Sequence, residues 1–166
     1  MLKDKKYKQL GSYGLIINDD KILLIKKNGG PYDGKLDLPG GTIEFGESPQ
    51  ETLKRELQEE VGIIVKEYKL FDANSVFFNW QYEDLIINVH HIGIFYNVLK
   101  YDGKIKSKVD ITSENDDSLG ADFYQINSLK KKELSEIAII ELEKLGYNIY
   151  NWKFKIIVKF ITNWYV

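Results

Sequence analysis

The first half of the chain alternates short runs of aliphatic residues with polar or glycine-containing breaks. Residues 14–18 and 21–26 are two such runs on either side of an Asn-Asp-Asp turn, which predicts a β-hairpin. A glycine-rich loop at residues 28–34 separates this hairpin from a short apolar strand at residues 36–38. We therefore expect three strands before the first helix.

The first helix is marked by the residues at its two ends. Ser48 and Glu51 have the spacing of a capping box, and Pro49 stands at the first helical position. Gly62 is the expected end of the helix. The apolar stripe that would pack on a sheet consists of Leu53, Leu57 and Val61.

The second half of the chain adds strands and one more helix. Apolar runs predict strands at residues 63–70, 88–98 and 122–126. A helix is expected at residues 136–145, with Ser135 as its cap and Gly146 after its end. The aromatic tail at residues 152–164 fits both a strand and a helix, so its pattern leaves both open. Several strands with two helices predict an α+β or α/β sandwich.

Length and composition narrow the class of protein. We expect one domain, residues 1–166, with its core at about residues 11–145 and a C-terminal extension at residues 146–166. The net charge of −2 gives no basic surface for long nucleic acid, and the lack of cysteine excludes disulfides, thiolate metal sites and cysteine nucleophiles. No long apolar run follows the lysine-rich start, so we expect no membrane segment and a soluble, cytoplasmic protein. The aromatic tail is a candidate contact in a homodimer.

Three carboxylates are predicted on one face of the first helix. Glu56, Glu59 and Glu60 are three and four positions apart, and a helix brings such positions to the same side. Unpaired, they would repel one another by roughly 0.2–0.5 kcal/mol per pair, whereas a divalent cation would attract all three. Oxygen ligands without a nearby His or Cys favour Mg²⁺, or Mn²⁺ as its substitute, over zinc. Because Mg²⁺ also takes up phosphate oxygens, we expect a small phosphate-bearing substrate.

Arg55 is the only arginine among the 23 lysine and arginine residues. A guanidinium holds a carboxylate through two parallel hydrogen bonds in one plane, whereas a lysine ammonium is a mobile point charge. We hypothesise that Arg55 clamps Glu47, in the turn before the helix, and so fixes this turn against the carboxylates. The alternative is a surface arginine without such a role.

These residues match a known signature: Gly, five residues, Glu, seven residues, and then Arg-Glu-aliphatic-x-Glu-Glu-x-Gly-aliphatic. Here the signature begins at Gly41 and ends at Ile63 without a departure. The chain thus resembles the Nudix hydrolases of the MutT-like or ADP-ribose pyrophosphatase-like type. The resemblance implies an α/β/α sandwich, in which helices flank a mixed central sheet. It also implies hydrolysis of a nucleoside diphosphate derivative through attack of water at one phosphorus.

The resemblance further assigns roles to residues of this chain. It implies that Glu56, Glu59 and Glu60 bind the Mg²⁺, with the carbonyl oxygen of Gly40 as a fourth ligand. One of these glutamates, or an acid from a later loop, would orient or deprotonate the water. Glu114 is our first choice for that later acid.

Two departures from the family pattern bear on the substrate. Leu36 stands where an aromatic residue is common, two places before the Leu-Pro-Gly-Gly stretch. Ser135 falls near the asparagine with which oxidised-guanine nucleotide hydrolases read their base. An ADP-ribose-like nucleotide is therefore favoured. The alternatives are an (8-oxo-)dNTP or NTP pyrophosphohydrolase of the housecleaning type and a non-catalytic nucleotide-sensing protein.

Some residues outside the signature have both a structural and a functional interpretation. Adjacent strand residues face opposite sides, so we expect His90 and His91 to do so as structural residues. Lys26 or Lys27, where the chain leaves the hairpin, is a candidate substrate contact. Four aromatic residues, expected between two strands, would pack at the core or stack on a nucleobase: Phe77, Phe78, Trp80 and Tyr82.

Overall fold

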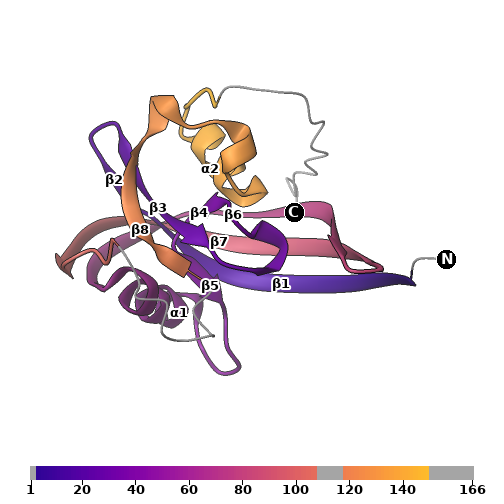
Figure 1. Cartoon of the computed structure of the whole chain (residues 1–166). Helices are drawn as coiled ribbons and strands as arrows, with labels where there is room; N and C mark the ends of the chain where they lie inside the picture. Colours follow the sequence, from indigo (N-terminus) through magenta and orange to yellow (C-terminus); the bar gives the residue numbers. More distant parts are fainter. Residues whose placement is uncertain (1–2, 108–117, 150–166) are drawn as a thin grey trace, which may run out of the picture.

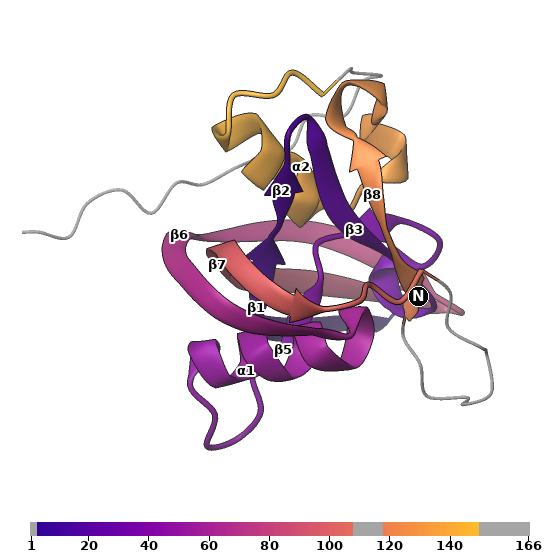
Figure 2. The same cartoon turned by 90° about the vertical axis from the view of Figure 1, so that its left-hand side faces the viewer.

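The computed structural model describes residues 3–107 and 118–149 of the chain. The strands form two sheets, and α1 and α2 lie on opposite faces of the larger one (Figures 1 and 2). The strands are β1 (Lys3–Leu15), β2 (Ile17–Asn18), β3 (Lys21–Lys27), β4 (Leu36–Asp37), β5 (Gly40–Thr42), β6 (Ile63–Tyr82), β7 (Leu85–Gly103) and β8 (Ser118–Gln125). The helices are α1 (Pro49–Glu56), its π-helical continuation η2 (Leu57–Val61) and α2 (Glu136–Lys144).

The larger sheet has the strand order β5-β1-β7-β6. β1 runs parallel to β7, while β6 and β7 form a long antiparallel hairpin. β5 is antiparallel to β1, which sets Gly40 opposite Tyr13 and Gly41 opposite Ser12. The predicted mixed sheet flanked by helices is therefore confirmed, and its β5 edge carries the glycine pair of the signature.

The smaller sheet has β3 at its centre, paired with β2, β4 and β8. The predicted hairpin is confirmed as β2 and β3, with Ile17 opposite Ile22. Alternate residues of β3 enter different cores: Ile22 and Leu24 pack toward α2, whereas Leu23 and Ile25 pack toward α1. This two-sided burial explains why β3 reads as a continuous apolar run.

The predicted apolar stripe of the first helix lies in the core between α1 and the sheets. Leu53, Leu57 and Val61 are all fully buried there. Burying each such side chain contributes about 1.5–3 kcal/mol. The signature helix is therefore anchored to a rigid scaffold along its length.

The strands of the larger sheet are longer than the sequence pattern indicated. β1 begins at Lys3, whereas the first predicted strand began at residue 14, and β6 continues to Tyr82 instead of ending near residue 70. The four aromatic residues at 77–82 therefore lie within a strand, which corrects the expectation that they lie between two. Here β1, β6 and β7 extend beyond the helices (Figure 1), so neither face is fully buried and the alternation that marks a strand is weak.

The start of the signature helix follows the prediction, and its last turn differs from it. The Ser48 hydroxyl accepts the Glu51 N–H, and the Glu51 carboxylate accepts the Ser48 N–H, which completes the capping box. Gly62 ends the helix at φ 81° in the left-handed region. The turn that carries Glu59 and Glu60 is π-helical, so the even rotation of an α-helix does not extend from Glu56 to these two residues.

The predicted second helix is present as α2. The Ser135 hydroxyl accepts the Ala138 N–H at 3.1 Å, and Gly146 follows the helix end with φ 89°. The predictions for Glu114 and for the tail at residues 152–164 fall outside the described residues. Within residues 3–107 and 118–149, no helix is long and apolar enough to span a membrane.

Candidate active site

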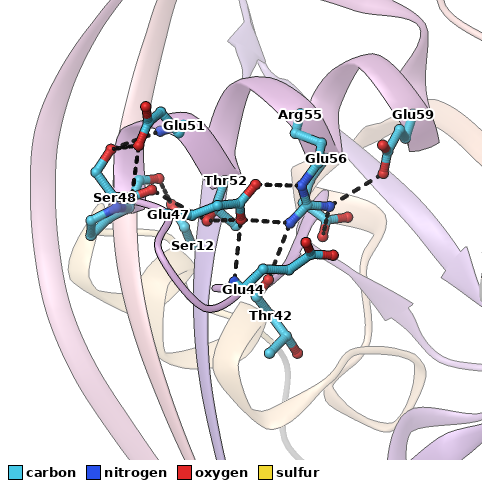
Figure 3. A network of polar contacts seen from close by, with 11 residues as sticks. Ser12, Thr42, Glu44, Glu47, Ser48, Glu51, Thr52, Arg55, Glu56 and Glu59 are labelled. Atoms are coloured by element: carbon cyan, nitrogen blue, oxygen red, sulfur yellow. Dashed lines mark hydrogen bonds and ion pairs between the residues drawn. The ribbon is translucent and has the colours of Figure 1, made fainter.

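The Arg55 guanidinium grips Glu47 with two hydrogen bonds (Figure 3). Nε donates to Glu47 Oε1 at 2.7 Å, and Nη2 donates to Glu47 Oε2 at 2.9 Å. The Thr52 hydroxyl donates to the same carboxylate at 2.7 Å. These bonds, first that from Arg55 and then that from Thr52, lower the pKa of Glu47 to about 2. The hypothesised contact is present, and it ties the turn before α1 to the helix.

The same guanidinium also reaches the helix carboxylates. Arg55 Nη1 donates to Glu56 Oε1 at 2.7 Å and to Glu59 Oε2 at 3.3 Å, and Nη2 donates to the Thr42 carbonyl at 3.3 Å. Figure 3 shows these acceptors on three sides of one planar group. An ammonium has three donors on a single atom and cannot span acceptors so far apart. This geometry explains why the position holds the only arginine of the chain.

The glycine pair of β5 lies against two of the glutamates. The Gly40 N–H donates to Glu60 Oε2 at 2.9 Å. A methyl group added at Gly41 would lie 2.5 Å from Glu56 Oε1, so any larger residue would push this carboxylate out of its present position. Gly40 has φ 140°, and a side chain there would also meet the Ser12 carbonyl at 2.2 Å. Backbone and carboxylates are therefore in close contact at this edge.

The three helix glutamates face different partners in the structure. Their side chains are 15%, 61% and 6% exposed for Glu56, Glu59 and Glu60 respectively. Arg55 draws the first two toward itself, while the Gly40 N–H holds the third. Among the described residues, no three acidic or histidine side chains converge closely enough to hold a metal ion. The expected single patch is thus divided by the π turn and by these contacts.

Lys27 is the lysine of the predicted pair that reaches the signature. Its Nζ lies 3.7 Å from Glu60 Oε1, and its side chain is 14% exposed. The neighbouring Lys26 is exposed, and its side chain lies on the other side of β3. In the sheet, Lys26 is in register with Leu36 of β4. Because side chains alternate along a strand, Lys27 faces the signature glutamates and Lys26 faces away from them.

His91 is the centre of a buried polar group next to the glycine pair. The Tyr13 hydroxyl lies 2.6 Å from His91 Nε2, and the Tyr32 hydroxyl lies 2.9 Å from Nδ1. Burial lowers the pKa of His91 to about 3, so the ring is neutral and accepts a hydrogen bond from one tyrosine while donating one to the other. His90 faces the opposite side of β7 and stacks on Phe77 at 3.9 Å. The predicted opposite facing of the two histidines is confirmed.

Asp37 is a buried acid that the sequence interpretation missed. Its Oδ1 accepts the Ser135 hydroxyl at 2.5 Å and the Leu38 N–H at 2.8 Å, and burial raises its pKa. The Ser135 N–H donates to the Leu36 carbonyl, so the start of α2 is fixed to β4. The position of Asp37 between two leucines of a short apolar strand could have indicated that this carboxylate is buried.

The chain belongs to the Nudix family, because the family model of the NUDIX domain matches residues 8–146. It is therefore a Nudix hydrolase of the pyrophosphohydrolase class. The glutamates, Arg55 and the glycine pair described above all lie within the matched residues.

Individual relatives differ in the substrate that they are named for. An ADP-ribose pyrophosphatase from Methanocaldococcus jannaschii is 34% identical over 128 residues, which are 77% of this chain and 68% of the relative. An 8-oxo-dGTP diphosphatase from Haemophilus influenzae is 34% identical over 103 residues, which are 61% of this chain and 69% of the relative. Among solved structures, a MutT Nudix hydrolase from Burkholderia pseudomallei has a TM-score of 0.65 at 24% identity and covers 84% of this chain and 98% of its own. This last likeness shows the fold.

Proposed function

We propose that the chain is a Mg²⁺-dependent hydrolase that cleaves the diphosphate linkage of an ADP-ribose-like nucleotide, with Mn²⁺ as a substitute ion. The observation that carries this proposal is the extent of the similarity to the Methanocaldococcus ADP-ribose pyrophosphatase, which spans 77% of the chain. The Haemophilus 8-oxo-dGTP diphosphatase aligns with 61% of the chain at the same identity.

The side chains around the glycine pair are of the donor type that a divalent cation prefers, and a bound ion would draw together the three glutamates that the structure holds apart. The donors are carboxylate oxygens, and Gly41 leaves the space at its Cα to the Glu56 carboxylate. In the proposal Glu56, Glu59 and Glu60 hold the ion, with the Gly40 carbonyl as a further ligand. A bound divalent cation neutralises a diphosphate and lowers the pKa of a water molecule.

The reaction forms a bond between the water oxygen and one phosphorus and breaks the bond from that phosphorus to the bridging oxygen. The proton lost by the water passes to a carboxylate, which is one of the helix glutamates or Glu114. With ADP-ribose the products are AMP and ribose 5-phosphate. Arg55 is a positioning residue in this scheme, because it bonds to Glu47, Glu56 and Glu59 and so fixes their orientation.

A nucleoside triphosphate, oxidised or not, is the second candidate substrate. Relatives named as 8-oxo-dGTP diphosphatases favour it. The surroundings of Ser135 speak against reading of an oxidised guanine, because this hydroxyl is fully buried and already bonded to Asp37 and to the Ala138 N–H. No side-chain amide stands at this position to bond a guanine edge.

The test is a substrate panel with product analysis. ADP-ribose, a dinucleoside polyphosphate, dGTP and 8-oxo-dGTP are each incubated with the full chain in Mg²⁺ and in Mn²⁺. We expect AMP and ribose 5-phosphate as the fastest products. Faster release of pyrophosphate from 8-oxo-dGTP would shift the assignment to the second candidate, and binding without turnover of any compound would make the chain a nucleotide sensor.

Two variants show whether turnover belongs to this site. Glu59→Gln removes a charge from the expected ligand set, and we expect its kcat to fall by about 100-fold or more. Glu67→Gln is the matched control, because Glu67 is an exposed glutamate on β6 whose only described ion pair is a surface contact with Lys100. Equal activity of the two variants would contradict the ligand assignment.

A further inference from the structure

Lys27 is an inward-facing cation at the edge of the carboxylate group. It continues the side of β3 that carries Leu23 and Ile25, which pack toward α1. This side leads directly to η2, so the long side chain of Lys27 ends at Glu60 and remains mostly shielded from solvent. Lys27 is not part of the signature, but it contacts Glu60, which is.

Both oxygens of Glu60 are engaged in the structure. Oε2 accepts the Gly40 N–H at 2.9 Å, and Oε1 faces Lys27 Nζ at 3.7 Å. A divalent cation bound by Glu60 would stand within a few ångströms of this ammonium. Like charges at such a distance repel strongly where water is largely excluded. The ammonium and the ion therefore compete for the same carboxylate.

A displaced ammonium needs another anion within reach of its flexible stem. The diphosphate of the substrate is that anion, because it must lie beside the ion that the glutamates hold. We propose that Lys27 exchanges partners during binding: it pairs with Glu60 in the metal-free chain and contacts the substrate diphosphate once Glu60 holds the ion. This inference rests on the proposed function, and it makes Lys27 a substrate-contacting residue.

The exchange has a thermodynamic consequence. A diphosphate that takes up Lys27 removes the competitor of the metal ion at Glu60, so diphosphate and metal each strengthen the binding of the other. Direct contact between ion and phosphate gives part of this coupling in any case. A variant that lacks the Lys27 ammonium removes only the share of the coupling that depends on Lys27.

The test measures binding without catalysis. Free Mn²⁺ is followed by electron paramagnetic resonance during titration of the full chain, with and without α,β-methylene-ADP, a diphosphate that this chemistry cannot cleave at the bridging atom. In Lys27→Met, we expect Mn²⁺ alone to bind about three- to tenfold more tightly, because its competitor is gone. We expect the analogue to bind about tenfold more weakly to the Mn²⁺-loaded variant, and the enhancement of Mn²⁺ affinity by the analogue to be smaller than in the unaltered chain.

Lys26→Met is the matched control, because Lys26 is adjacent but exposed on the other side of β3. It should match the unaltered chain in every titration. Circular dichroism checks folding, and Lys27→Gln replaces the methionine variant if that protein does not fold. Unchanged or weaker Mn²⁺ binding in a folded Lys27 variant, or an unchanged affinity for the analogue, would overturn the exchange. Since Mn²⁺ binding is measured without nucleotide, failure to hydrolyse ADP-ribose would reject the proposed substrate and leave the tighter Mn²⁺ binding as a separate result.

Discussion

The buried imidazole of His91 makes the stability of the folded chain depend on pH. Burial lowers the pKa of this ring from an ordinary value of 6.5 to about 3. In the unfolded chain the ring is hydrated and titrates near its ordinary value. Between these two pKa values the unfolded state binds a proton that the folded state does not bind. Stability from this group is therefore complete above the unfolded pKa and is lost as the pH falls toward the folded one.

The size of the effect follows from the separation of the two pKa values. A difference of one bound proton changes the free energy of unfolding by about 1.4 kcal/mol per pH unit. Over the window from pH 6.5 to about pH 3, His91 alone removes roughly 5 kcal/mol. Since small proteins have a total stability of only about 5–15 kcal/mol, a change of this size is a large part of it.

The assay compares urea unfolding of the unaltered chain and of His91→Gln from pH 7 to pH 4. Glutamine keeps one acceptor and one donor for Tyr13 and Tyr32 but does not titrate. We expect the difference in unfolding free energy between the two proteins to change by about 1.4 kcal/mol per pH unit, with the unaltered chain losing stability faster on acidification. All other titrating groups are common to both proteins and cancel in the difference.

His90→Gln is the control, because His90 lies on the other side of β7 and is only partly buried. It should change the pH dependence much less than His91→Gln does. Parallel stability curves for the unaltered chain and His91→Gln would refute the argument, since they would mean that the buried ring binds its proton as readily in the folded state as in the unfolded one.

Three further predictions concern single positions. Arg55→Lys should fold normally by circular dichroism and lose about 100-fold in kcat, because an ammonium cannot hold Glu47 and Glu56 in fixed planes together; full activity would contradict this. Gly41→Ala should weaken Mn²⁺ binding about tenfold by pushing on the Glu56 carboxylate, and unchanged titrations would exclude that contact. Burial raises the pKa of Glu141 to about 7, so the contribution of this carboxyl group to stability grows as the pH falls from 7 to 4.5, opposite to that of His91; Glu141→Gln should lose this contribution and should melt roughly 7–14 °C higher at pH 8.

Local rules account for the parts that the sequence predicted well. The capping box at Ser48, the stripe on α1 and the end at Gly62 each depend on residues within a few positions of one another. The hairpin of β2 and β3 is equally local. Arg55 and Glu47 are also close in sequence, and the presence of a single arginine in the chain indicated a specific role for this residue.

The parts that sequence interpretation missed depend on distant partners. Tyr13 and His91 are 78 positions apart, and Asp37 and Ser135 are 98 positions apart. The sequence pattern does not mark such a pair, because the burial of each polar side chain is explained only by a partner that is distant in sequence. The N-terminal half of β1 is a similar case, since its lysine-rich sequence becomes a strand through pairing with β7. The π turn is a further case, since no residue type between Leu57 and Val61 requires it.

Arg55 and Lys27 are two of the cations beside the signature glutamates, and their different anchors suit different roles. Arg55 is held by the turn at Glu47 and by the Thr42 carbonyl as well as by the helix, so moving it would break several bonds at once. The contact between Lys27 and Glu60 joins one ammonium to one oxygen at 3.7 Å, and a rotation about the lysine stem can separate this pair. A fixed planar cation sets the direction of Glu56 and Glu59, whereas a mobile point charge can leave Glu60 when a stronger cation arrives. Exchanging the two residue types would therefore loosen Glu56 and Glu59, which need a fixed direction, and would restrain Glu60, whose contact with the cation must open.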